Sequence, residues 1–229
     1  MIRRKSPQRN LYVLFCFFGI LFLNNFVLPS VQDSPADKPK AAQYAVARAT
    51  SEIIVDGVLD DTAWMQAEVD LIQKAVNKGK VILGSCFGHQ IIARALFGMA
   101  AVRKRVKPEI GWPDIQIVSN DSLFGQSGRT IHTFIFHYDE VCTVPEEKAT
   151  IIARSKECNI LAFKVKDRPV WGIQPHFEMG IVQGLRYIDN VKGNQVPDRQ
   201  IFFRSTQYMP KDSGWVIPLM KAFHETHPV

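Results

Sequence analysis

The residue best suited to chemistry in this sequence is Cys86, in the segment GSCFG at 84–88. A short β-branched run, 80–84, precedes it and a helical pattern, 90–96, follows it. A G-x-C-x-G motif between a buried strand and a helix is typical of a nucleophile elbow, with sulfur in place of the serine oxygen. The helix N-terminus favours the thiolate, and the backbone N–H of Phe87 is placed to receive a developing oxyanion. Taken alone, the segment also fits a structural cysteine in a glycine-rich turn.

A second chemical pair, His176 and Glu178, follows the strand-like stretch 170–174. In an extended chain, a spacing of two points both side chains to the same side. A histidine beside the thiol, oriented by a carboxylate, would complete a Cys–His–Glu triad. Because His-x-Glu alone is a common accident, the prediction of a triad depends on this pair together with the elbow at Cys86.

Several blocks of the sequence resemble the class I (triad-type) glutamine amidotransferases, in that family's order. The resemblance covers residues 71–187. It departs from the family pattern at His176, where the proline (Pro175) and the aromatic residue (Phe177) have traded places. The blocks are Gly84–Gln90 with the following IIARALFG, Glu109–Trp112, His137–Val141 with Pro145, Ser155–Cys158 with Phe163, and Gly172–Glu178.

The resemblance implies hydrolysis of the side-chain amide of glutamine through a glutamyl thioester. It gives Cys86 the role of nucleophile, His176 that of general base and Glu178 that of the orienting acid, with the backbone of Phe87 in the oxyanion site. In the family the released ammonia passes to a synthetase domain or subunit, so a synthetase partner is expected. The close alternative is a γ-glutamyl peptidase or hydrolase, and an inactive protein with a binding role is the third hypothesis.

The resemblance also implies that Gln90 and the backbone around Phe136 and His137 hold the glutamine. His137 is itself a candidate for lining the substrate pocket, whereas His89, at the start of the helix after the elbow, is expected to be structural. No cofactor is expected, and no metal, because no Cys/His spacing resembles a zinc site. The basic run 103–107 is expected to form a solvated loop.

The pattern of apolar residues predicts the elements that must position these side chains. Spacings of three and four predict a helix over 61–79 that ends at Gly79. The other predicted strands are 115–118, 130–136, 150–153, 160–165 and 170–174, and the other helices are 181–191 and 215–224. This order predicts an open α/β sheet, and the resemblance makes it flavodoxin-like and Rossmann-type with helices on both faces. Its first strands are expected to be missing, because only residues 44–83 remain between the linker and the nucleophile.

The N-terminal residues are expected to form segments distinct from the amidotransferase-like domain at 71–229. In residues 1–30 a basic start precedes an apolar run, which predicts a signal peptide, with a membrane anchor and a wrongly assigned start site as alternatives. Residues 31–45 are typical of a polar linker. Residues 46–70 resemble the opening strand of a family-9-like carbohydrate-binding module, or alternatively the amidotransferase segment that precedes its first helix here.

Composition limits the remaining possibilities. With 46% hydrophobic and 22% charged residues among 229, the chain is not disordered, collagen-like or a polytopic membrane protein. Of the 28 basic residues, four lie in residues 1–30, and without them 24 remain against 22 acidic residues. We therefore expect no nucleic-acid partner, and membrane contact only through the leader. The leader suggests a secreted or anchored protein, whereas the family resemblance suggests the cytoplasm.

Overall fold

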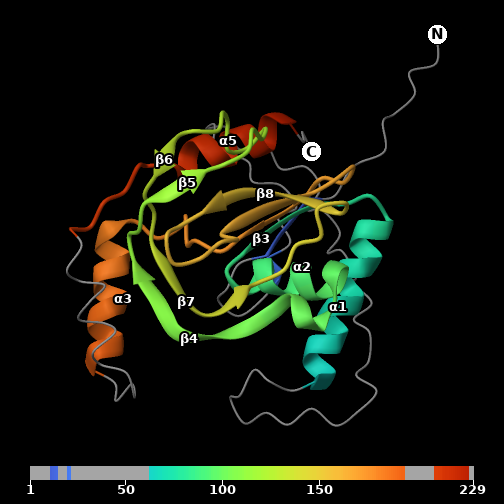
Figure 1. The fold of residues 1–229 in the computed structure, drawn as a ribbon, viewed down its shortest axis with the longest axis horizontal. Helices are drawn as coiled ribbons and strands as arrows, with labels where there is room; N and C mark the ends of the chain where they lie inside the picture. Colours follow the sequence, from blue (N-terminus) through green and yellow to red (C-terminus); the bar gives the residue numbers. More distant parts are fainter. Residues whose placement is uncertain (1–10, 15–19, 22–61, 194–208, 227–229) are drawn as a thin grey trace, which may run out of the picture.

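The computed structural model describes residues 11–14, 20–21, 62–193 and 209–226, which form a main sheet, a two-stranded ribbon and flanking helices (Figure 1). The main sheet has the strand order β2-β1-β3-β10-β9-β8-β5-β6, and the ribbon pairs β4 with β7. The strands are β1 (Leu11–Leu14), β2 (Ile20–Leu21), β3 (Val81–Ser85), β4 (Val102–Gly111), β5 (Ile115–Ile117), β6 (Thr130–Ile131), β7 (Ile135–Val141), β8 (Ala149–Arg154), β9 (Ala162–Val165) and β10 (Val170–Ile173).

Strand direction brings two carboxyl ends together at the middle of the main sheet. β3 runs parallel to β1 on one side and to β10 on the other, whereas the remaining pairs in the sheet are antiparallel. Parallel neighbours end at the same edge, and the residues that follow them are the usual place for a site in an open α/β sheet. The segments that follow Ser85 and Ile173 therefore meet at this edge.

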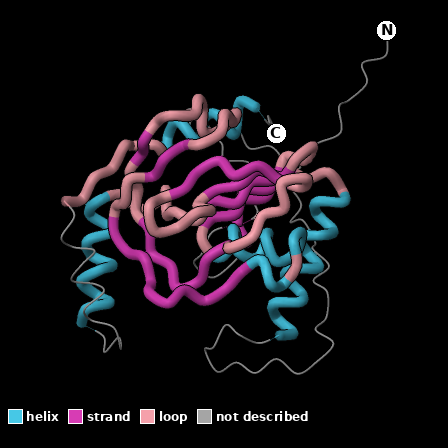
Figure 2. Tube along the Cα trace, in the orientation of Figure 1, coloured by secondary structure: helices cyan, strands magenta, loops and turns pink. Residues whose placement is uncertain are grey.

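Helices cover both faces of the sheet, as Figure 2 shows by the helices on either side of the central strands. The alternation of side chains along β3 decides which core each residue enters. Ile82 packs into the cluster that contains residues of α1 (Thr62–Asn77) and α2 (Phe87–Phe97). Val81 and Leu83 point the other way, into the cluster that contains Leu219 and Phe223 of α5 (Val216–Thr226). The strand is thus buried on both faces, as its unbroken apolar run requires.

A third, smaller cluster joins the ribbon to α3 (Ile181–Gly193). Ile110 from β4, Trp112 and Phe134 from the adjoining segments and Ile188 from α3 form this cluster. Figure 1 shows the ribbon curving below the main sheet, with α3 at one side. A short 3₁₀ helix, η1 (Met99–Ala101), connects α2 to β4.

The predicted fold class is confirmed, but two predicted segments differ. The expected strand 130–136 is split, because β6 joins the main sheet and β7 begins at Ile135 in the ribbon. The basic run 103–107 lies inside the ten-residue strand β4 and is not a loop. Most positions of β4 are at least partly exposed, so its sequence lacks the alternation that predicts a half-buried strand.

The sheet also extends beyond β3 into the segment that was expected to be a leader. Leu11–Leu14 form β1, whose Leu11 is paired with Val81 and whose Leu14 is paired with Gly84. The expectation that the sheet lacks strands before the nucleophile therefore differs from the structure at this point. A run that is apolar throughout fits both a leader and a central parallel strand, so its pattern cannot separate them. The rest of 1–30, the linker 31–45 and most of 46–70 lie outside the described residues.

Within the described ranges, no helix combines the length and the apolar character needed to cross a bilayer.

Candidate active site

Cys86 lies at a sharp turn between β3 and α2, as the G-x-C-x-G motif predicts. Its backbone has φ 51° and ψ −105°, and a positive φ is rare for a residue with a side chain. The glycines explain how so tight a turn packs, because a Cβ on Gly84 would lie 2.6 Å from the carbonyl carbon and oxygen of Gly88. The elbow (residues 84–88) is therefore a strained strand–helix junction that depends on glycine at 84.

The neighbouring strand holds the elbow from the side. Ser85 is in register with Ile173, and the N–H of Cys86 donates to the carbonyl of Ile173 at 2.8 Å. One residue back, the hydroxyl of Ser85 donates to the carbonyl of Pro175 at 3.2 Å. The loop after β10 is thus tied to the elbow before it reaches His176.

His176 and Glu178 interact directly in this loop. Nδ1 of His176 lies 2.7 Å from Oε1 of Glu178, and the histidine is buried while the Glu178 side chain is 29% exposed. The backbone N–H of His176 donates to the carbonyl of Phe134 at 2.7 Å, which fixes the histidine from the ribbon side. Pro175 and Phe177, which have traded places relative to the family, both make contacts here. The carbonyl of Pro175 accepts from Ser85, and Phe177 packs in the core.

The first residues of β7 complete the surroundings of the thiol. The Cys86 Sγ lies 3.7 Å from the carbonyl oxygen of Phe136 and donates to it. The prediction placed the backbone around Phe136 at the substrate, and the structure brings that backbone to the elbow. Its role towards a substrate stays a prediction.

Gln90, the second predicted substrate residue, is buried one helical turn after the elbow. Its Nε2 donates to the carbonyl of Asp139 at 3.0 Å and to Oε1 of Gln174 at 3.1 Å. Gln90 therefore links α2 to the ribbon and to the end of β10. The contact with Asp139 lies in the same stretch of β7 that reaches Cys86.

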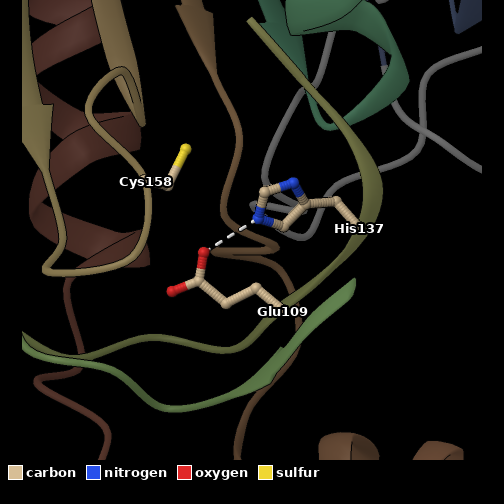
Figure 3. Close-up of side chains that lie close together, drawn as sticks. All are labelled: Glu109, His137 and Cys158. Carbon is tan, nitrogen blue, oxygen red and sulfur yellow. Dashed lines mark hydrogen bonds and ion pairs between the residues drawn. The ribbon is translucent and has the colours of Figure 1, made fainter. Parts of the chain in front are cut away.

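The side chain of His137 contacts other protein groups on both ring nitrogens. Nδ1 lies 2.7 Å from the carbonyl oxygen of Asp139, and Nε2 lies 3.1 Å from Oε2 of Glu109. The side chain is 1% exposed. Figure 3 shows the imidazole directed towards Glu109, with Cys158 beside the pair. Any role for His137 in lining a pocket would therefore fall to its backbone.

Glu109, His137 and Cys158 bring three metal-ligating atoms within 4.8 Å of one another. Their chemistry does not suit a metal, because each is already engaged. Glu109 accepts from Ser155 Oγ at 3.1 Å, its Oε2 lies 3.1 Å from Nε2 of His137, and the Arg105 guanidinium lies 3.9 Å from it. Burial, reinforced by the charge of Glu109, raises the pKa of Cys158 to about 12, so this sulfur stays a protonated thiol. Sequence reasoning noted Glu109 and Ser155 only as matching blocks and gave them no role.

His89 is a structural histidine, as predicted. It is fully buried on α2, and its ring lies against that of Phe163 with centroids 5.0 Å apart. Burial lowers the pKa of His89 to about 3, with a smaller contribution from the nearby His137. It is therefore a neutral imidazole near pH 7.

The sequence is similar to one protein family and to several proteins of known name. The family model for glutamine amidotransferase class-I matches residues 29–190. One subunit of the glutamine-hydrolysing GMP synthase from Methanothermobacter thermautotrophicus is 36% identical over 110 residues, which cover 48% of this chain and 58% of that protein. Gamma-glutamyl peptidase 4 of Arabidopsis thaliana is 36% identical over 112 residues, covering 47% and 44%. The aligned residues thus span about half the length of these relatives.

Solved structures agree on the fold. A glutamine amidotransferase from Thermotoga maritima superposes with a TM-score of 0.54 at 22% identity, covering 73% of this chain and 71% of that one. One from Methylobacillus flagellatus gives 0.55 at 21% identity with the same coverage. The matched family range also includes residues 46–68, which favours the amidotransferase alternative for that segment over the carbohydrate-binding one.

Proposed function

Because this chain belongs to the class-I glutamine amidotransferase family, we propose that it hydrolyses the side-chain amide of glutamine with Cys86, His176 and Glu178 as its triad. The observation that carries the proposal is the pairing of two parallel strand ends. Cys86 follows β3 in a strained turn, and the loop after the adjoining β10 brings His176 with its carboxylate partner. Two segments that start from neighbouring strand ends support a triad, whose chemistry needs the imidazole beside the thiol.

In the first half of the reaction, the Cys86 thiolate attacks the amide carbon of glutamine. The dipole of α2 favours the thiolate, and the N–H of Phe87, the first residue of α2, stabilises the oxyanion. With Nδ1 of His176 bonded to Glu178, Nε2 is the nitrogen that exchanges protons with the thiol and the leaving group. The C–N bond breaks as His176 protonates the departing ammonia, leaving a glutamyl thioester.

In the second half, water replaces ammonia. His176 takes a proton from the water, whose oxygen attacks the thioester carbonyl, and the C–S bond breaks to release glutamate and the thiolate. Glu178 keeps the imidazole in one tautomer through both halves.

The test is ammonia release from glutamine by the full chain. We expect turnover by the wild type and none by Cys86→Ala. Cys142→Ala is the matched control, because the Cys142 thiol donates to the carbonyls of Ala100 and Ala101, beyond the far end of α2 from the elbow. Equal rates for wild type and Cys86→Ala would reject the proposal.

The second candidate is a γ-glutamyl peptidase, and the similarity to the Arabidopsis peptidase favours it. The same thiol chemistry would then release an amine from a γ-glutamyl peptide. Comparing kcat/KM for glutamine with kcat/KM for a γ-glutamyl dipeptide separates the two. A preference for the dipeptide of a hundredfold or more, about 3 kcal/mol of transition-state binding, would assign the peptidase activity.

A synthetase partner is proposed because several relatives are named as one subunit of a synthase. The partner would consume the ammonia in forming a new C–N bond. Mixing the chain with a candidate ATP-dependent synthetase should raise glutamine hydrolysis only when the synthetase has its own substrates.

The N-terminal leader and the carbohydrate-binding resemblance also remain proposals, as does an inactive binding protein. A glutamine-like electrophile that fails to label Cys86, while iodoacetamide does label it, would favour the binding role. Recovery of the chain with a new N-terminus near residue 30 from an expressing cell would support a cleaved leader.

A further inference from the structure

A continuous set of hydrogen bonds connects Glu109 to the helix that follows the elbow. Oε2 of Glu109 contacts Nε2 of His137, and Nδ1 of His137 contacts the carbonyl of Asp139. The same carbonyl accepts from Nε2 of Gln90 at 3.0 Å. The imidazole therefore lies between a buried carboxylate and the carbonyl that holds Gln90.

The two contacts of His137 hold its ring from both sides. A carbonyl can only accept, so the Nδ1 that faces Asp139 carries a hydrogen and donates it. On the opposite side of the ring, Nε2 lies 3.1 Å from Oε2 of Glu109. The imidazole is thus fixed between two polar groups, with its donor directed at the Asp139 carbonyl.

The surroundings of Glu109 hold this pair in place. Ser155 Oγ donates to its other oxygen at 3.1 Å, and the guanidinium of Arg105 lies 3.9 Å from Oε2 while also pairing with Glu140. The neighbouring Cys158 is a protonated thiol and adds no charge to the cluster. Ser155, in the loop after β8, and Arg105, on β4, thus restrain the carboxylate that contacts the imidazole.

The Asp139 carbonyl in turn orients the amide of Gln90. Because that carbonyl must receive a hydrogen, the atom facing it is Nε2, and the second Nε2 hydrogen is used by Gln174 Oε1. The amide oxygen of Gln90, which can only accept, is the group of this side chain that suits a donor on a ligand. An α-ammonium group, which glutamine and γ-glutamyl compounds both carry, is a donor of matching chemistry.

We propose that His137, held by Glu109, is a positioning residue that fixes the Asp139 carbonyl and through it the amide of Gln90 for substrate binding. The inference rests on the proposed function, and it adds that His137 sets the orientation of the substrate-binding residue Gln90. His137 acts before the chemical step, so its loss weakens substrate and transition state equally, which raises KM and leaves kcat unchanged.

Two substitutions of His137 separate its contact with the Asp139 carbonyl from its contact with Glu109. His137→Asn places an amide nitrogen near the position of Nδ1 and keeps a donor for the Asp139 carbonyl, whereas His137→Gln reaches towards Glu109 and gives up that donor. We expect His137→Gln to raise KM for glutamine about tenfold with kcat within about twofold, and His137→Asn to stay closer to wild type. Cys158→Ser, in the same cluster but outside the hydrogen-bond series, is the matched control and should leave KM unchanged.

Four further measurements separate the positioning role of His137 from damage to the fold and from loss of activity. In His137→Asn, the rate of Cys86 alkylation by iodoacetamide and the melting temperature should match those of the wild type. Glu109→Ala should raise KM, and Glu109→Gln should keep KM close to the wild-type value. Glutamine Kd, measured by calorimetry in a Cys86→Ala background, should weaken about tenfold with His137→Gln.

The outcomes are distinguishable. If the protein releases no ammonia but still binds glutamine, and His137→Gln weakens that binding, hydrolysis is rejected and the positioning role is supported. Equal KM and Kd for His137→Gln and wild type would overturn the inference, as would equal losses in both His137 variants. Absence of glutamine binding by the Cys86→Ala protein would overturn it as well.

Discussion

Ser85 and Ile173 are register partners at the ends of two parallel strands, and each is the last residue before a segment that carries chemistry. Cys86 follows Ser85 directly and donates its backbone N–H to Ile173. The loop after Ile173 leads within three residues to His176, whose ring contacts Glu178. One pair of strand ends thus brings two segments that are far apart in the sequence to the same edge of the sheet.

The proposed triad predicts a graded loss of activity. His176→Asn removes the general acid and base, so we expect kcat for glutamine to fall by roughly 10²–10⁴. Glu178→Gln leaves the ring but weakens its orientation, and a smaller fall is expected. Glu146→Gln, an exposed carboxylate, is the control. Steady-state ammonia release measures each, and wild-type kcat in His176→Asn would contradict the triad.

Alanine at Gly84 should disrupt the elbow. The added Cβ would lie 2.6 Å from backbone atoms of Gly88 and 2.5 Å from Ile92 Cδ1, and backbone atoms cannot move aside cheaply. We expect the free energy of unfolding to fall by about 1–3 kcal/mol, measured by urea titration. Gly180→Ala is the matched control, since its Cβ approaches only the ends of flexible side chains, Gln183 and Asp212. Equal stability of both variants would show that the elbow has room for a side chain.

The N-terminal strand makes a prediction that a cleavable leader would not. Deleting residues 1–30 removes β1 and exposes the edge of β3, so the free energy of unfolding should fall by a few kcal/mol. Deleting only residues 1–10 keeps β1 and serves as the control. Chemical unfolding of the three proteins gives the comparison, and a 31–229 protein as stable as the full chain would favour the leader.

His89 should make the protein less stable in acid. Its pKa in the folded state is about 3, below the ordinary value of 6.5, so between these pH values the unfolded chain binds a proton that the folded chain excludes. The stability that His89 contributes is complete above pH 6.5 and is lost as the pH falls towards 3, by roughly 1 kcal/mol per pH unit. His89→Leu, which cannot ionise, should show a smaller slope of unfolding free energy with pH. An identical slope in both proteins would mean that other groups cause the acid sensitivity.

Local patterns predicted most elements of the fold, because strongly apolar or strongly amphipathic segments carry their own period. The helix that became α1 and the strand that became β3 are examples. β4 was missed because a two-stranded ribbon leaves most of its side chains exposed and its basic residues look like a loop. β1 was assigned to a leader because an apolar run has no period that separates a buried strand from a targeting segment.

The sequence by itself determined which residues are candidates for chemistry. A cysteine between spaced glycines at a strand–helix junction, with a His-x-Glu pair further on, is a local pattern that can be read without coordinates. Only the tertiary structure decided which groups surround these residues, since the pairing of β3 with β10 and the approach of β7 to the elbow are long-range contacts. For the same reason the link from Glu109 through His137 to Gln90 was not predicted, because its members come from separate elements that meet only when the chain folds.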